Sequence, residues 1–462
     1  MIDTRIGGAT AQLPTGSAAV DILVDQGLIV GIVDRSSEVS ATTAIDAAGL
    51  HLLPGVVDLH AHTRTPGLTH KEDFRTASYA AAAGGITTIV DMPNVEPPTD
   101  SVERLEHKRE IAAADCIVDW GHFVSGSQPD RVEALAAAGA TGFKIFMVGG
   151  GYPHDDRIAV SSNAQLYAAL RAIAPTGLPC LVHPFDQSLF DMFTKEALAA
   201  GRPPDFRTRA DIYAGIDIVW RCAVATLLEF QEDTGVRLHL LHTHAAGSIT
   251  RIREAKARGL PVTAALDPKY FHLTRENMER LGPRAYSGAA VTEDRARVAA
   301  IWTALKDGTI DTIDSDHGPH TLEEVDIARV DAWKAQLGSP QYDELLSLLL
   351  TDVNEGRVDL ETVVRLMCEN PARLIGRYPQ KGAIAVGGDA DLVLVDMAAS
   401  RVAKDGDGYT KVGWTPYHGR TLRGVPVLTM RRGEVIARDR RVLEGVSPGR
   451  YLEGRAATWP AG

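Results

Sequence analysis

The chain has 462 residues, more than one compact domain usually holds, so a large domain with a smaller satellite is expected. Its apolar content of 45% and charged content of 23% exclude a disordered or collagenous chain. The formal net charge of -12 argues against nucleic acid or an anionic membrane as a partner.

The cysteines and the absence of targeting or membrane segments indicate the cellular compartment of the protein. Its 4 cysteines are scattered and form no CxxC pair, which argues against a disulfide framework and against a thiolate metal site. The first residues lack the basic and apolar regions of a signal peptide, and no run is long enough to span a bilayer. We therefore expect a cytoplasmic protein without a membrane partner.

Both ends of the chain predict β-structure. Residues 20–33 indicate two strands around a turn at Gln26-Gly27, and a further strand is expected near residues 51–53. Near the other end, glycine-rich turns separate runs that predict strands at residues 390–395, 425–430 and 433–437. We expect the two ends to pair in one small domain.

Between these ends, short β-branched runs alternate with helical patterns, as in parallel βαβ units. Strands are expected near residues 55–62, 87–92, 116–124, 142–147, 179–183, 238–242, 262–266 and 312–316. Helices are expected between them, for example at residues 165–173, 212–232, 249–257 and 295–305. This α/β pattern predicts a (β/α)8 TIM barrel at residues 54–378, with residues 1–53 and 379–462 forming a composite β-sandwich domain.

The first barrel strand ends in two histidines. His60 and His62 lie two residues apart, and the two-residue period of a strand places both imidazoles on the same face. They could bind one cation together, although a single HxH motif is also compatible with an incidental pair.

Later strands bring further groups to the same end of the barrel. Lys144 lies in an apolar run, where its ammonium either escapes at the strand end or is deprotonated and captures CO2 as a carbamate that bridges two cations. His183 and His242 end the fifth and sixth strands, and either is also compatible with a simple rim histidine. Asp316 follows the eighth strand, where a carboxylate can also cap a turn.

Five strands thus deliver titratable groups to one mouth of the barrel, and that mouth is where TIM-barrel enzymes build their active sites. Coincidence explains this convergence poorly. A set of imidazoles and carboxylates without thiolate suits Zn²⁺ and also allows Mn²⁺, Fe²⁺ or Co²⁺. The sequence therefore predicts a metal-dependent active site at this mouth.

The order HxH, lysine, histidine, histidine, aspartate resembles the amidohydrolase superfamily, and more narrowly its cyclic amidohydrolases. The segments that carry this resemblance are similar to those of dihydroorotases, allantoinases and hydantoinases. They read HAHTRTPG, AAAAGGITTIVDMPN, GFKIFM and SDHGPH, followed by ENPARLIG and KGAIAVGGDADLVLVD. The resemblance covers nearly the whole chain.

This resemblance implies a binuclear metal centre. The more buried ion would be held by His60, His62 and Asp316, and an N6-carboxylysine formed from CO2 at Lys144 would bridge it to a second ion held by His183 and His242. His244 is a competing ligand for the second ion. Asp316 would also be the catalytic group that takes a proton from water and returns it to the leaving nitrogen.

The resemblance to dihydroorotases also implies that Arg64, Asn94 and His320 bind a substrate carboxylate. The alternatives are an arginine in a loop salt bridge, an asparagine that forms a turn and a histidine at the rim. Ser287 is a further expected substrate contact. It begins the sequence SGAAV, where dihydroorotases have Asn-Pro-Pro-Leu-Arg.

The loop at residues 148–153 departs from the hydantoinase pattern. Hydantoinases place a tyrosine five residues after the lysine, whereas this chain has Gly149 there, and Tyr152 is a candidate substitute. We expect a small-molecule cyclic amide, imide or ureide that carries a carboxylate, with dihydroorotate as the leading named candidate. Allantoinase or hydantoinase/dihydropyrimidinase activity is the alternative.

Two other classes of function stay open at this point. One is a non-catalytic binding protein built on the same fold, and the other is a mononuclear deaminase, which needs no bridging lysine. Family habit also implies a homo-oligomer, either a dimer or a tetramer.

Overall fold

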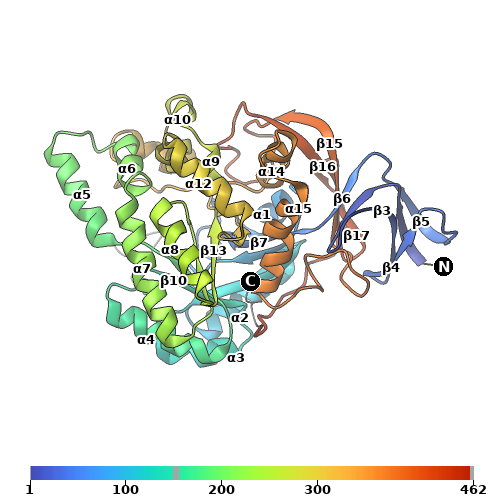
Figure 1. Ribbon diagram of the computed structural model, residues 1–462, viewed down its shortest axis with the longest axis horizontal. Helices are drawn as coiled ribbons and strands as arrows, with labels where there is room; N and C mark the ends of the chain where they lie inside the picture. The colour runs from blue at the N-terminus through green and yellow to red at the C-terminus, as the bar shows by residue number, and fades with distance from the viewer. Residues whose placement is uncertain (1, 149–154, 156, 458–462) are drawn as a thin grey trace.

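The chain folds into a parallel β/α barrel with a β-rich domain beside it (Figure 1). The computed structural model describes residues 2–148, 155 and 157–457. In Figure 1 the barrel and its helices occupy the left, and blue N-terminal strands stand beside red and orange C-terminal strands on the right. This arrangement confirms the predicted fold class.

Eight strands form the barrel, and each pairs in parallel with its neighbours in chain order. They are buried along their whole length, which explains their continuous apolar runs. The strands are β7 (Val56–Ala61), β8 (Ile86–Asp91), β9 (Asp119–Ser125), β10 (Gly142–Phe146), β11 (Cys180–His183), β12 (Leu238–Leu240), β13 (Val262–Leu266) and β14 (Thr312–Ile313).

The barrel closes between β7 and the segment after β14. Ala61 forms a parallel bridge with His317, and the amide of His62 donates to the His317 carbonyl at 2.9 Å. Ser315 donates from its amide and its hydroxyl to the carboxylate of Asp58, at 2.7 and 2.8 Å. Closure therefore fixes His60 and His62 against the segment that carries Asp316.

Helices surround the barrel, and shorter helices lie within the connections between its strands. They are α1 (Phe74–Ala83), α2 (Val102–Asp115), α3 (Val132–Ala137), α4 (Asn163–Ile173), α5 (Gln187–Ala199), α6 (Phe206–Tyr213), α7 (Asp217–Thr234), α8 (Ala246–Ala257), α9 (Lys269–His272), α10 (Arg275–Leu281), α11 (Tyr286–Thr292), α12 (Arg295–Lys306), α13 (Leu322–Asp326), α14 (Leu345–Asn354), α15 (Leu360–Val364) and α16 (Asn370–Leu374). None of the described helices has the length and apolar character needed to cross a membrane.

The predicted helix at residues 212–232 is wrong at its start. Helix α6 ends at Tyr213 and α7 begins only at Asp217. The guanidinium of Arg297 donates to the carbonyls of Ala214 and Gly215, at 2.7 and 3.0 Å. These carbonyls are thus satisfied by a distant side chain, and the chain turns between the two helices.

The β domain joins the two ends of the chain, as predicted. Strand β6 pairs in parallel with β2 from the N-terminal part and antiparallel with β15 from the C-terminal part. The domain's strands are β1 (Ile2–Gly7), β2 (Thr10–Leu13), β3 (Gly16–Asp25), β4 (Leu28–Asp34), β5 (Ala41–Asp46), β6 (His51–Pro54), β15 (Leu392–Val402), β16 (Thr421–Arg431), β17 (Glu434–Arg438) and β18 (Arg441–Val442).

A buried lysine links this domain to the barrel. The ammonium of Lys381 lies 2.5 Å from Asp119 of β9, 2.8 Å from Asp389 and 2.5 Å from Asp391. Burial alone would lower the pKa of Lys381, but the three carboxylates raise it above its usual value. A charged lysine therefore fills a group of carboxylates that would otherwise resemble a cation site.

The last described segment returns to the barrel. Tyr451 forms a parallel bridge with Trp120 of β9, and the hydroxyl of Thr141 donates to the Leu452 carbonyl at 2.8 Å. This segment lies by the first residues of β9, away from the strand ends that carry the site. The predicted C-terminal part of the β domain thus includes residues that pack on the barrel.

Candidate metal and substrate site

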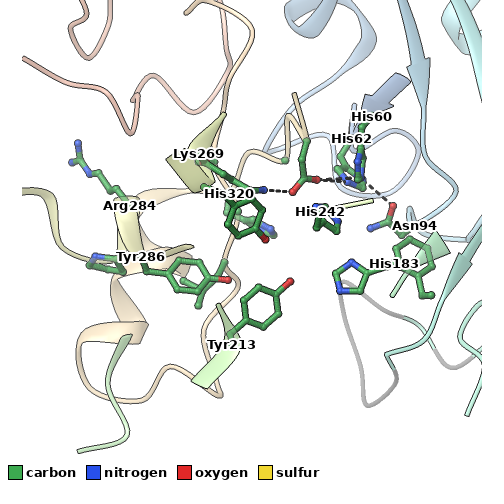
Figure 2. Close-up of a pocket in the computed structure, with 18 of the residues that line it drawn as sticks. His60, His62, Asn94, His183, Tyr213, His242, Lys269, Arg284, Tyr286 and His320 are labelled. Carbon is green, nitrogen blue, oxygen red and sulfur yellow. Dashed lines mark hydrogen bonds and ion pairs between the residues drawn. The ribbon is translucent and has the colours of Figure 1, made fainter. Parts of the chain in front are cut away.

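A cavity of about 90 Å³ opens where the barrel strands end (Figure 2). Its lining includes all six residues that the sequence analysis assigned as metal ligands: His60, His62, Lys144, His183, His242 and Asp316. They come from β7, β10 and β11 and from the segments after β7, β12 and β14. Parallel strands bring these distant positions together because their carboxyl ends share one mouth.

His60, His62 and Asp316 form the tightest group. Oδ1 of Asp316 lies 3.2 Å from Nε2 of His60 and 3.1 Å from Nε2 of His62. Nδ1 of His62 hydrogen-bonds Oδ1 of Asn94 at 2.9 Å, which turns Nε2 toward the carboxylate. One nitrogen from each ring and one carboxylate oxygen thus lie within 4.8 Å of one another, as ligands of one ion require.

His242 and His183 lie beside this group. The ring centroid of His242 is 5.2 Å from that of His60 and 4.7 Å from that of His183. Asp267, just after β13, holds Nδ1 of His242 at 2.5 Å, an arrangement that commonly orients a metal-binding imidazole. His183, His242 and His60 thus form a row of imidazoles along the mouth.

Burial prepares the histidines to bind a cation. It lowers the pKa of His60 well below its usual value and lowers that of His62 to about 4. Both rings are therefore neutral near pH 7 and keep a lone pair for a metal ion.

Lys144 is completely buried among these groups. Within the described part of the chain its ammonium has no hydrogen-bond partner, and it lies 4.7 Å from the ring centroid of Phe146. Burial lowers the pKa of Lys144 to about 7, although Asp316 and Asp267 oppose this shift. A neutral amine near pH 7 is the form that reacts with CO2, so the residues present fit a carbamate-bridged metal pair.

The structure separates His242 from His244. The ring of His244 is stacked on Tyr270 at 4.2 Å, and its Nδ1 hydrogen-bonds the His242 carbonyl at 2.7 Å. His244 packs behind the cavity, whereas His242 lines it. This placement favours His242 as the ligand.

The backbone is strained at three site residues. Arg64, His242 and Asp316 have φ values of +60°, +55° and +46°, a region that side chains with a Cβ rarely adopt. Such strain persists only where the surrounding structure enforces it, and it often accompanies a functional position.

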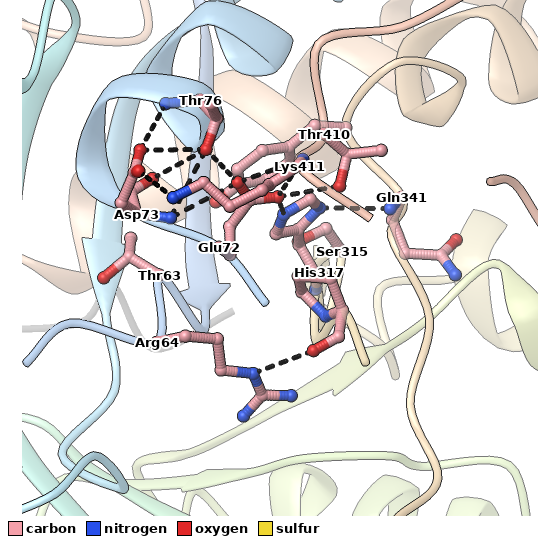
Figure 3. Close-up of polar contacts among 12 residues, drawn as sticks. Thr63, Arg64, Glu72, Asp73, Thr76, Ser315, His317, Gln341, Thr410 and Lys411 are labelled. Carbon is pink, nitrogen blue, oxygen red and sulfur yellow. Dashed lines mark hydrogen bonds and ion pairs between the residues drawn. The ribbon is translucent and has the colours of Figure 1, made fainter. Parts of the chain in front are cut away.

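The expected carboxylate-binding residues lie on one wall (Figure 3 shows Arg64 among its neighbours). Nε of Arg64 donates to the Pro319 carbonyl at 3.1 Å, and its second nitrogen lies 3.1 Å from Nε2 of His320. Nδ1 of His320 lies 3.3 Å from the ammonium of Lys71. Glu324 lies 2.8 Å from that ammonium and balances its charge, so the buried Arg64 guanidinium supplies the positive charge of this wall. Asn94 hydrogen-bonds His62, so it also orients one of the expected metal ligands.

The lining residues that sequence reasoning missed include Tyr213, Lys269, Arg284 and Tyr286. Lys269 forms an ion pair with Oδ2 of Asp316 and lies 3.6 Å from Asp267. Burial alone would raise the pKa of Asp316, but Lys269 and His60 hold it well below its usual value. The signal for Lys269 was its position in the Asp-Pro-Lys-Tyr run directly after a barrel strand.

Two predicted positions lie outside the described atoms. Ser287 belongs to α11, but its side chain is not described, and Tyr152 lies in a segment outside the described residues. Their roles stay predictions. Phe185, two residues after His183, packs on that imidazole at 5.8 Å.

The match to known proteins covers most of the chain. The model of the amidohydrolase family matches residues 51–436. The chain belongs to the amidohydrolase family. This amidohydrolase superposes on the solved L-hydantoinase (dihydropyrimidinase) from Arthrobacter aurescens with a TM-score of 0.92 and 32% identity, over 98% of this chain and 100% of that chain.

Relatives of this amidohydrolase have several different names. A dihydroorotase from Methanosphaera stadtmanae is 31% identical over 92% of this chain and 94% of the relative. An allantoinase from Deinococcus radiodurans is 31% identical over 98% of this chain and 99% of the relative. The resemblance inferred from the sequence is therefore confirmed. Because these relatives open different rings, the pocket of this amidohydrolase determines which ring it opens.

Proposed function

We propose that this chain is a metal-dependent cyclic amidohydrolase that opens a small cyclic amide, imide or ureide ring bearing a carboxylate. The observation that carries the proposal is the convergence of His60, His62, Asp316 and Lys144 in a cavity with a positively charged wall. A cytoplasmic location and a homo-oligomer belong to the proposal as expectations from the sequence.

The metal pair is part of the proposal. His60, His62 and Asp316 would hold one ion, His183 and His242 the other, and a carbamate on Lys144 would join them. Zn²⁺ suits these ligands best, and Mn²⁺, Fe²⁺ and Co²⁺ are compatible. When bound, such ions lower the pKa of water and polarise a carbonyl.

Asp316 is positioned to move the proton. One oxygen faces the imidazoles of His60 and His62, and the other accepts from Lys269. The low pKa of Asp316 keeps it ionised near pH 7, so it accepts the proton of the attacking water. It then returns this proton to the ring nitrogen as the C–N bond breaks.

The cavity supports a small anionic ring. Arg64 lines it beside Lys269 and Arg284, which pair with Asp316 and Asp405, and a guanidinium favours a substrate carboxylate. Its volume of about 90 Å³ lies well below the range of roughly 300–1,000 Å³ that drug-sized ligands occupy. A single ring with a short substituent fits this space better than a ring with a large side chain.

The first test measures metals per chain and ring opening in one preparation. We expect about two metal ions per chain, as for a binuclear site, and turnover of at least one ring among dihydroorotate, allantoin, hydantoin, dihydrouracil and succinimide. Absence of metal and of turnover, after reconstitution with divalent ions and bicarbonate, would favour a binding protein. About one ion per chain, retained without bicarbonate, would favour a mononuclear deaminase.

A matched substrate pair tests the carboxylate. Dihydroorotate and dihydrouracil have the same ring and differ in the carboxylate, so we expect kcat/KM to be higher for dihydroorotate. Arg64→Met should lower kcat/KM about 100-fold for dihydroorotate, as loss of a buried charged contact does, and change it little for dihydrouracil. Arg157→Met, on the surface, is the control. A preference for dihydrouracil or hydantoin would support the hydantoinase alternative.

A further inference from the structure

Two tyrosine hydroxyls point into the pocket from its outer wall (Figure 2). Tyr213 is the last residue of α6, and Tyr286 is the first residue of α11. Both rings line the cavity, and their centroids are 6.4 Å apart. Among the described residues neither hydroxyl has a hydrogen-bond partner. Two donors thus face the space where a substrate would lie.

The ring of Tyr213 is held by aromatic neighbours. Phe185 and Trp220 both lie 5.2 Å from it, and the plane of the Trp220 ring is at 87° to that of Tyr213. Nε1 of Trp220 donates to the Tyr213 carbonyl at 2.5 Å, which also fixes the backbone at the end of α6. The phenol is therefore held in place without a bond to its hydroxyl.

The same neighbours contact the metal-binding imidazoles. Trp220 lies 5.5 Å from His183 and 6.2 Å from His242, and Phe185 lies 5.8 Å from His183. One packed cluster therefore fixes the phenol of Tyr213 relative to the imidazoles. The charged groups that act on the phenol of Tyr286 are Arg209, Lys269 and Asp316.

The hydroxyl of Tyr213 is a donor near neutral pH. Burial raises the pKa of Tyr213 well above its usual value, and Tyr286 and Asp316 add to this shift. Tyr213 is half-buried and its ring lines the cavity, so its hydroxyl can donate to an acceptor on a bound substrate. The acceptor that every cyclic amide offers is its carbonyl oxygen.

We propose that Tyr213 is a catalytic residue that donates a hydrogen bond to the oxygen of the carbonyl under attack. The inference rests on the function proposed above. As the water oxygen bonds to the carbonyl carbon, its proton passes to Asp316 and the carbonyl electron pair moves onto the oxygen that Tyr213 contacts. When the C–N bond breaks, the carbonyl forms again, and the ring nitrogen takes the proton from Asp316. A fixed donor at such an oxygen stabilises the transition state more than the bound substrate.

The test compares two phenylalanine variants. Tyr213→Phe keeps the ring and its packing and removes only the hydroxyl. Tyr167→Phe is the matched control, because Tyr167 lies on α4 and its hydroxyl contacts Asp233 at the surface. We expect Tyr213→Phe to lower kcat about 100-fold, the usual effect of removing one such donor, with KM within threefold of the wild type. Metal content and Tm should match the wild type, and Tyr167→Phe should behave as the wild type throughout.

Each other outcome overturns a distinct statement. A wild-type enzyme that opens no ring overturns the proposed function and this assignment with it. An active wild type with a Tyr213→Phe kcat within threefold overturns the assignment alone. A raised KM at unchanged kcat shows that the hydroxyl only binds the substrate. Loss of metal or a fall in Tm shows a structural role, and both results overturn the catalytic assignment.

Discussion

At the residue scale, Asp316 joins the two halves of the site. It contacts His60 and His62 through one oxygen and Lys269 through the other. Its left-handed backbone follows a strand of only two residues, so the carboxylate is aimed by barrel closure and not by the strand itself. Its position therefore depends on groups from two segments that are distant from it in sequence.

Asp316→Asn tests the proton-transfer role. The amide keeps the shape of the side chain but cannot accept the proton, so we expect kcat to fall by about 100-fold to 10,000-fold, the usual contribution of such a group. Circular dichroism and Tm should show a folded protein. A kcat near that of the wild type would contradict proton transfer by Asp316.

The buried His239 is expected to make the stability of the folded protein depend on pH. It lies on β12, its Nδ1 hydrogen-bonds Thr263 at 2.8 Å, and burial lowers its pKa to about 3. The unfolded state therefore binds this proton below about pH 6.5 while the folded state does not. The stabilising contribution of His239 is complete above pH 6.5 and is lost as the pH falls from there toward 3.

The measurement is urea unfolding between pH 7.5 and 4.5. Below pH 6 the wild type should lose about 1.4 kcal/mol of unfolding free energy per pH unit more than His239→Gln, whose side chain does not titrate. Parallel pH profiles of the two proteins would show that His239 is not buried in its neutral form.

At the element scale, α9 and α11 position the wall that carries Lys269 and Tyr286. The two helices touch at Gly288, where an added Cβ would lie 1.8 Å from the Lys269 carbonyl and 2.9 Å from Leu273. This glycine is required because α11 packs directly on the backbone of α9.

Gly288→Ala should therefore displace α9 and Lys269 with it. We expect a loss of stability of about 1–3 kcal/mol, as for overpacking, together with a lower kcat/KM. Gly247→Ala is the matched control, because it is also in a helix but its Cβ would meet only the flexible Arg221 side chain. Equal Tm values for the two variants would contradict the close contact of α9 and α11.

Sequence reasoning reached the site through local periodicity. The alternation of β7 places His60 and His62 on one face, and strand order brings Lys144 to the same mouth. Tyr213 escaped prediction because its place depends on the break between α6 and α7, which Arg297 of a distant helix enforces. Lys269 escaped because its partner Asp316 lies after the next strand, and no local pattern records that pairing.

At the scale of the whole molecule, Lys381 connects the barrel to the β domain through three buried carboxylates. Lys381→Met would leave them facing one another without a cation. We expect a loss of about 3–5 kcal/mol, as when one partner of a buried ion pair is removed. The midpoint of urea unfolding measures it, with the exposed Lys195→Met on α5 as the control. A midpoint unchanged by Lys381→Met would show that the carboxylates are protonated or hydrated instead.

The pairing of β6 with β15 also determines the order in which the protein can be completed as it leaves the ribosome. β6 is synthesised before the barrel and its partner β15 after it. The edge of β6 that will pair with β15 therefore stays unpaired while the barrel strands are synthesised. This edge includes the apolar residues Leu52 and Leu53. The β domain closes only near the end of translation, after the catalytic mouth has already been synthesised.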